Sequence, residues 1–219
     1  MDSTPSFVEH KFYMIPRIQY LNDTYSMITF GVGGEIDAEK HVKMFLPQST
    51  FLGFDPNPNY SNLFTDILGG KFVQATVSGK NEKITTRELK EGGLGQYAPV
   101  VDKQAQSAAE LIETYHGTDK IIDFLSVDVE GAEYSIFERL IKDKIYQNVC
   151  QINVELHPVW YHFTGYSYFD VVKIFRNLFT DGTFLWVDST LNPPQQWPSF
   201  FINVKKEECI EKYLKNRLL

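Results

Sequence analysis

Residues 123–133 read DFLSVDVEGAE, and this stretch does most to define the fold. Its first half is an apolar run that includes the small Ser126, which is typical of a strand buried on both faces of a parallel sheet. Asp128 and Glu130 follow at the carboxyl end of that strand. If the chain is still extended there, both carboxylates point to the same side. Because ligands of open α/β sheets bind beyond the carboxyl ends of the strands, we expect chemistry at this place.

The strand predicted next along the chain ends in a similar way. Residues 153–158 read NVELHP, in which Glu155 and His157 are two residues apart and Pro158 ends the strand because it lacks an N–H donor. If the two strands are neighbours, three carboxylates and one imidazole converge at one edge of the sheet, and such clusters mark functional sites more often than structural ones. The predicted catalytic residues are Asp128, Glu130, Glu155 and His157.

Two alternatives concern the same segment. A metal site built from these four residues is chemically possible, because hard carboxylates suit Mg²⁺ or Mn²⁺. Nothing in the sequence sets the ligand geometry, so no metal is predicted. Glu133 follows at the expected start of a helix, where an acid complements the helix dipole, and we interpret it as structural.

A glycine turn precedes this region. An apolar strand at 27–30 leads into GVGG at 31–34, and glycine allows the backbone to approach a nucleotide-like ligand closely. Asp55 ends the next predicted strand about 20 residues downstream, where open α/β sheets place the carboxylate that accepts both ribose hydroxyls. A dinucleotide fingerprint would need a third glycine, but Ile36 occupies that position. A nicotinamide oxidoreductase is therefore the weaker alternative.

The rest of the chain alternates short β-rich runs with helical patterns, as in a doubly wound parallel sheet with helices on both faces. Strands are predicted at 27–30, 50–55, 71–77, 121–129, 149–156, 183–187 and 200–204. Helices are predicted at 36–45, 60–68, 104–115, 134–142 and 170–179. The pattern is irregular between the third and fourth strands, with a possible strand at 83–89 and a flexible loop at 92–95, and a turn-rich segment at 192–198 joins the last two strands.

Length and composition favour one domain. The chain has 219 residues, of which 43% are hydrophobic, enough for a single core. We predict an N-terminal extension or strap at 1–24, a core at 25–204 and a C-terminal helix at 205–219. No apolar stretch is long enough to span a membrane, and residues 1–5 do not resemble a signal peptide.

Charge and cysteine content exclude some partners. The net charge is −7 with no run of four basic residues, so nucleic acid is not expected as a partner. Cys150 lies in an apolar run and Cys209 in a charged helical pattern, so neither a disulfide nor a zinc site is expected. A reducing compartment follows, and the chain is predicted to be cytoplasmic and not membrane-bound.

The sequence resembles the FkbM-type methyltransferases, especially their divergent animal branch typified by nematode proteins. The matching pieces are FGVGGEI at 30–36, GFDPNP at 53–58 and, most specifically, FLSVDVEGAE at 124–133. In order and spacing these pieces extend over roughly 60% of the chain, counting on to the NVELHP segment.

This resemblance implies a class I methyltransferase, Rossmann-like sheet of seven strands with the last strand antiparallel. It also implies transfer of a methyl group from S-adenosyl-L-methionine to an oxygen of a small molecule or glycan. The glycine turn would hold the methionine part and the ribose, Asp55 the ribose hydroxyls, and Thr76 and Val77 would border the adenine. The residues expected to bind the cofactor are Gly31, Val32, Gly33, Gly34, Glu35, Asp55, Pro56, Asn57, Thr76, Val77 and Asp128.

The first turn departs from the family pattern. Many members begin this turn with an acid and close it with glycine, whereas this chain has Gly31 and Asp37 at those places. The acid usually helps to bind the methionine amino group, and Glu35, Asp37 or Glu39 would have to substitute for it. A cofactor-binding member without catalytic turnover is the second alternative. The general base is left between Glu130 and His157.

Overall fold

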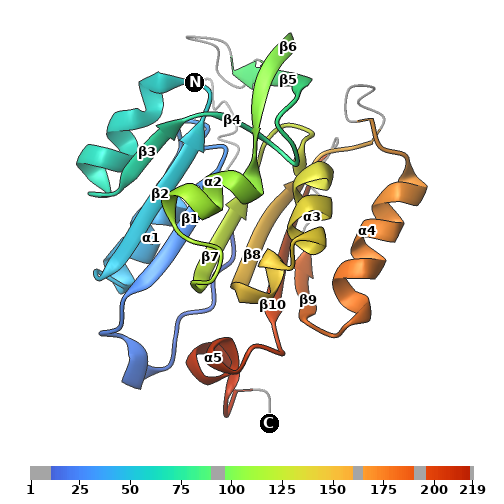
Figure 1. The fold of residues 1–219 in the computed structure, drawn as a ribbon. Coiled ribbons are helices and arrows are strands. Elements are labelled where there is room, and N and C mark those ends of the chain that lie inside the picture. Colours follow the sequence, from blue (N-terminus) through green and yellow to red (C-terminus); the bar gives the residue numbers. More distant parts are fainter. Residues whose placement is uncertain (1–10, 90–96, 160–164, 190–195, 218–219) are drawn as a thin grey trace, which may run out of the picture.

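A seven-stranded sheet forms the centre of the molecule (Figure 1). The structure, a computed structural model, describes residues 11–89, 97–159, 165–189 and 196–217. The strands of this sheet are β1 (Tyr25–Phe30), β2 (Ser49–Asp55), β3 (Lys71–Gln74), β7 (Ile122–Val127), β8 (Val149–Leu156), β9 (Phe184–Ser189) and β10 (Trp197–Asn203). They are ordered β3-β2-β1-β7-β8-β10-β9, with β10 antiparallel to both of its neighbours. The predicted seven-stranded, mostly parallel sheet is confirmed.

Helices cover both faces of this sheet, as a doubly wound fold requires. One face carries α2 (Ala108–Tyr115), α3 (Glu133–Lys142) and α4 (Tyr168–Thr180), which lie in front of the strands in Figure 1. The other face carries α1 (Asp37–Phe45), the π-helical turn η3 (Leu63–Ile67) and the C-terminal segment α5 (Glu207–Cys209) with η5 (Ile210–Leu214). Short 3-10 turns are η1 (Ile18–Tyr20), η2 (Pro58–Tyr60) and η4 (Ile145–Asn148).

Alternate residues of the central strands fill the two cores. In β1, Ile28 and Phe30 belong to the core under α2, α3 and α4, whereas Tyr25 and Met27 belong to the core on the opposite face. All four side chains are buried. This period of two is what a strand with a packed layer on each face requires.

Three element predictions need correction. The strand expected at 71–77 is two strands, since β4 (Thr76–Ser78) leaves the main sheet and pairs with β6 (Tyr97–Ser107), which also pairs with β5 (Lys83–Leu89). The helix expected at 104–115 begins only at Ala108, because residues 105–107 pair with β4 and long-range pairing overrides local propensity. The segment expected as a helix at 60–68 is helical over 60–67, but its last five residues, η3, form a π-helix and not an α-helix.

The small sheet stands above the carboxyl ends of the central strands (Figure 1). Its β5 therefore reaches the side of the molecule where ligands of such folds bind. The loop predicted at 92–95 lies outside the described residues, as does most of the turn-rich segment at 192–198, whose last two residues begin β10.

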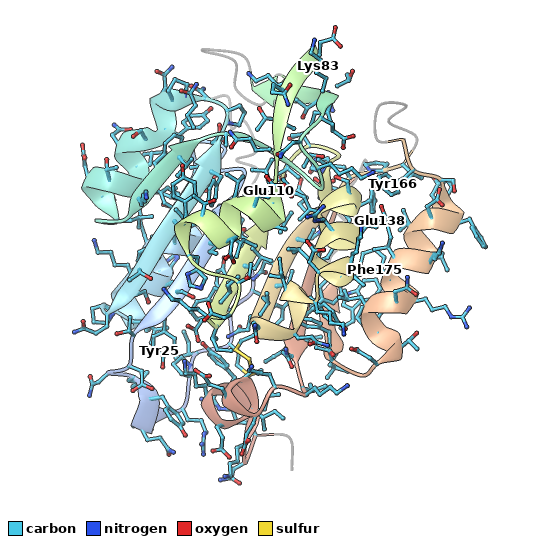
Figure 2. All side chains as sticks on the ribbon, viewed as in Figure 1. Tyr25, Lys83, Glu110, Glu138, Tyr166 and Phe175 are labelled. Atoms are coloured by element: carbon cyan, nitrogen blue, oxygen red, sulfur yellow. A yellow bond between two sulfur atoms is a disulfide. The ribbon has the colours of Figure 1, made fainter. Side chains whose placement is uncertain are left out.

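A disulfide joins the C-terminal segment to the central sheet. Cys150 in β8 and Cys209 in α5 are fully buried and bonded, with their Cα atoms 5.2 Å apart, and Figure 2 shows the bond in yellow. The expectation of unpaired cysteines is wrong, because α5 folds back over the face of β8 that carries Cys150. The inference of a reducing compartment rested on that expectation and loses its basis.

The N-terminal segment crosses the same face as a strap. The side-chain amide of Asn153 both donates to and accepts from the backbone of Phe12, and that of Gln151 does the same with Met14. The two amides thus give the strap hydrogen bonds of the kind that a neighbouring strand would supply. Among the described residues, no helix is both long and apolar enough to cross a bilayer.

Candidate active site

The glycine turn after β1 is built around a close backbone contact. Gly31 has φ +83°, and a Cβ atom placed on it would lie 1.7 Å from the carbonyl oxygen of Asp128. Gly33 also has a positive φ, +65°, but no atom lies within 4 Å of a Cβ placed there. Of these two glycines, only Gly31 is therefore required by packing as well as by conformation.

Asp55 at the end of β2 holds this turn in shape. Its Oδ2 accepts hydrogen bonds from the backbone N–H groups of Val32 at 2.9 Å and Gly33 at 3.2 Å. Its Oδ1 accepts one from the N–H of Asn57 at 2.8 Å. The carboxylate is buried, and it links the two segments that the sequence assigned to the cofactor.

A cavity of about 290 Å³ opens beside the turn. The predicted cofactor residues that line it are Gly31, Gly33, Asp55, Pro56, Asn57, Thr76, Val77 and Asp128. Three others do not line it. Val32 packs into the core, Gly34 faces the Tyr60 ring, and Glu35 is exposed.

Sequence reasoning missed several residues that line the same cavity, and three of them have polar side chains. Tyr60 comes from η2, and Thr86 and Arg87 come from β5. Burial, followed by the nearby Asp55, raises the pKa of Tyr60. Residues 83–89 were predicted as a possible strand, but no local signal indicated that this strand lies over the cavity beside the glycine turn.

None of the three acids proposed to replace the missing first acid lines the cavity. Glu35 is exposed, Asp37 forms a surface ion pair with Lys40 at 2.8 Å, and Glu39 is buried with its Oε1 accepting from Thr29 at 2.9 Å. The backbone carbonyl of Asp128 lies against Gly31, and Asp128 also lines the cavity.

The turn after β7 brings the predicted catalytic residues together, although not in the expected way. The strand ends at Val127, and Glu130 has φ +55°, so the chain is not extended across Asp128 and Glu130. The prediction that an extended chain puts both carboxylates on the same side is therefore wrong. Glu130 has a left-handed backbone conformation instead, and its carboxylate lies near His157. Asp128, Glu130 and His157 each offer a ligand atom within 4.8 Å of the others.

His157 is fully buried at the end of β8 and lies among carboxylates. Its Nδ1 is 2.8 Å from Oε1 of Glu133, and its Nε2 is 3.4 Å from Oε2 of Glu130 and 3.6 Å from Oε1 of Glu155. The phenol of Tyr134 donates to its carbonyl oxygen. We refer to Asp128, Glu130, Glu155 and His157 as the rim cluster.

Glu133 does more than complement the dipole of α3. It is fully buried, and its Oε1 also accepts from the N–H groups of Val129 at 3.2 Å and Gly131 at 3.1 Å. One carboxylate oxygen thus holds both the turn that carries Glu130 and the ring of His157. The sequence predicted only a structural acid at Glu133 and did not indicate its contact with His157.

The surroundings of His157 favour positive charge. Burial by itself lowers the pKa of His157, because it penalises the imidazolium form. Glu133 opposes this through its charge and its hydrogen bond, and Glu130 and Asp128 add to the effect. The net result is a pKa well above the ordinary value for histidine.

Two further hollows are present, and only the first is lined by residues of the rim cluster. A very small one lies between β7, β8 and β10, where Asp128 and Glu155 line it together with Lys11 of the strap. A larger cavity of about 690 Å³ begins at Gly131 and extends between β5 and the helices α3 and α4. Its lining is rich in charged and hydroxyl side chains.

The strand order, the antiparallel last strand and the cavity at the carboxyl ends of β1 and β2 define a class I, Rossmann-like methyltransferase. Within this class the chain belongs to the FkbM methyltransferase family, whose domain matches residues 7–180. Members of this family use S-adenosylmethionine as the methyl donor. The expected family and cofactor class are thus confirmed, whereas the animal branch stays a prediction.

Several solved methyltransferase structures match this chain at low similarity. TrmK of M. capricolum, in complex with S-adenosyl-homocysteine, is 10% identical, covers 86% of this chain and 66% of its own, and has a TM-score of 0.43. Fibrillarin of Aeropyrum pernix with bound S-adenosyl-L-methionine is 10% identical, with 83% and 68% covered and a TM-score of 0.46. Precorrin-6y C5,15-methyltransferase of Geobacter metallireducens is 10% identical, with 83% and 81% covered and a TM-score of 0.44.

The chain therefore spans just under two thirds of the length of TrmK. None of these scores reaches 0.5, and the fold class rests on the strand order described above. No curated protein matches the sequence.

Proposed function

We propose that this protein transfers a methyl group from S-adenosylmethionine to a hydroxyl group of a small molecule or glycan. The observation that carries the proposal is the position of Asp128. This residue and Glu130 both line the cavity beside the glycine turn and belong to the rim cluster, so donor and acceptor chemistry meet at these two residues.

The cavity lining suits each part of the cofactor. The turn at Gly31 and Gly33 lets the backbone approach the methionine part and the ribose, Asp55 faces the ribose hydroxyls, and Thr76 and Val77 border the adenine. Asp128 takes the place of the missing first acid toward the methionine amino group.

The rim cluster supplies what the reaction needs from the protein. The sulfonium already activates the methyl carbon, so the protein has to hold a hydroxyl oxygen about 3 Å from it and accept the hydroxyl proton. The carboxylates of Glu130 and Glu155 flank Nε2 of His157 at 3.4 and 3.6 Å. The buried His157 positions them, and one of the two receives the proton.

The larger cavity supports a polar acceptor. It begins at Gly131, directly after Glu130, and its lining includes Lys80, Ser135 and Tyr166. Such side chains can hydrogen-bond several hydroxyls of one ligand. The exclusion of nucleic acid as a partner stays a prediction that rests on the net charge.

Binding of the cofactor is the first test. We expect calorimetry to show micromolar binding of S-adenosylmethionine by the wild type and at least about tenfold weaker binding by Asp55→Ala, since a hydrogen bond to a charged acceptor contributes roughly 1.5–3 kcal/mol. Asp55→Asn keeps the shape and one acceptor oxygen, so it should lie between the two. Tighter binding of NAD, or no binding of S-adenosylmethionine by the wild type, would contradict the proposal.

Replacement of the two flanking acids tests the proton-transfer step. In an acceptor screen that follows methyl transfer from labelled S-adenosylmethionine, we expect the variant of the proton-accepting residue, Glu130→Gln or Glu155→Gln, to lower kcat by about 10²–10⁴-fold. Its affinity for the cofactor should change little. If neither variant slows transfer, the rim cluster is not the catalytic site.

A further inference from the structure

We propose that the rim cluster binds a divalent cation, Mg²⁺ or Mn²⁺, through Asp128, Glu130 and His157. The binding site itself is argued from the side chains alone. The part that the cation plays in holding the acceptor rests on the function proposed above. The sequence indicated suitable ligand types but not their distances, and the structure shows that these ligand atoms lie close together.

Distances among the three residues suit a single ion. One carboxylate oxygen of Asp128, one of Glu130 and one ring nitrogen of His157 all lie within 4.8 Å of one another. A cation with bonds of about 2.0–2.6 Å can be shared by ligand atoms up to about 4–5 Å apart. Two carboxylates with one imidazole form a donor set that favours hard or borderline divalent ions such as Mn²⁺.

The support behind His157 is an observation independent of the acids that would bind the ion. Histidines that bind metals donate their second ring N–H to a carboxylate or carbonyl, which fixes the ring and directs the other nitrogen to the ion. Here Nδ1 lies 2.8 Å from the fully buried Glu133, and Nε2 is directed toward Glu130. The imidazole is thus held in the orientation that a ligand requires.

The same supporting residue also holds the turn that carries Glu130. Oε1 of Glu133 accepts from the backbone N–H groups of Val129 and Gly131, which flank Glu130 in the turn after β7. Glu130 is held there in a left-handed conformation, which costs about 1–2 kcal/mol for a residue other than glycine. A strained carboxylate in a turn that is fixed by a buried acid is typical of a built site.

Binding of the cation assigns roles to all four residues of the rim cluster. The cation orients the acceptor hydroxyl and favours its ionised form. Glu155, which is not among the three ligands, accepts the hydroxyl proton. As the oxygen–carbon bond forms, the carbon–sulfur bond breaks and its electron pair stays on sulfur, which leaves neutral S-adenosylhomocysteine and the methyl ether.

Titration of metal-free protein with Mn²⁺ tests the site without any substrate. Electron paramagnetic resonance measures free Mn²⁺, and we expect one ion bound per chain by the wild type. Asp128→Asn and Glu130→Gln should each weaken binding at least about tenfold, and Glu133→Gln by about 10–100-fold through loss of the support for His157. The matched control is Glu138→Gln on the exposed side of α3 (Figure 2), which should bind as the wild type does.

The outcomes separate this site from the proposed function. Thermal melts establish that each variant is folded, and Glu130→Gln, at the partly exposed rim, keeps the test valid if a buried variant unfolds. Absence of Mn²⁺ binding by the wild type, or equal binding by Glu130→Gln and Glu138→Gln, would overturn the metal site. Calorimetry with S-adenosylmethionine in EDTA tests the cofactor separately, so either proposal can fail while the other stands.

Discussion

Gly31→Ala is expected to destabilise the protein by about 2–5 kcal/mol and to abolish binding of S-adenosylmethionine. A positive φ costs a residue with a Cβ about 1–2 kcal/mol, and crowding in a packed region costs about 1–3 kcal/mol more. The new Cβ would meet the carbonyl of Asp128 at 1.7 Å. The contact cannot be relieved easily, because the N–H of Asp128 is hydrogen-bonded to the carbonyl of Phe30 at 2.9 Å.

Gly33→Ala is the matched control for this prediction. It also has a positive φ, but a Cβ there meets no atom within 4 Å, so only the conformational cost of about 1–2 kcal/mol applies. Urea unfolding of both variants measures the difference. Equal stability of the two would show that the backbone contact between the first turn and Asp128 does not constrain the site.

Removal of the disulfide between Cys150 and Cys209 is expected to lower the free energy of unfolding by about 4 kcal/mol. The bond closes a loop over a sequence separation of 59 residues, and the cost follows from the chain entropy that it removes from the unfolded state. The measurement is urea unfolding of the Cys150→Ala, Cys209→Ala double variant beside the wild type.

A reducing agent supplies the control for the disulfide. It should destabilise the wild type and leave the double variant unchanged. The buried ion pair of Lys212 with Asp123 at 3.2 Å and the hydrogen bond from Tyr213 to the same carboxylate at 3.0 Å remain in both. If mass spectrometry finds two free thiols in the native protein, this prediction fails.

The strands of the central sheet could be predicted from the sequence because they are continuous apolar runs that end in polar residues. The strand β8, Val149–Leu156, was predicted with the bounds that it has, since Pro158 lies just beyond it. Of the small sheet, only β5 at 83–89 was predicted, as a possible strand. The pairing of β4 with β6 was not predicted, because it joins residues 76–78 to 105–107 and neither run is distinctive alone. The positions of Thr86 and Arg87 at the cavity beside the glycine turn were therefore not predicted.

The candidate site was predictable in its members but not in its geometry. The two pairs, Asp128 with Glu130 and Glu155 with His157, were found because parallel neighbouring strands must end at the same edge. Their arrangement depends on the left-handed turn at Glu130 and on the buried contact between Glu133 and His157, which join residues 24 positions apart. A local pattern contains neither the sign of one φ angle nor a contact across that separation.

The conformation of Glu130 gives a criterion for sorting natural relatives. Glycine or asparagine would adopt the left-handed conformation at this position with less strain. Substitution by either residue would therefore lower the conformational cost but remove a carboxylate from the rim cluster. A homologue that retains an acid here bears a conformational cost that folding alone does not require. Genome surveys can use this one position to separate members under selection for turnover from those kept only as binders of the cofactor.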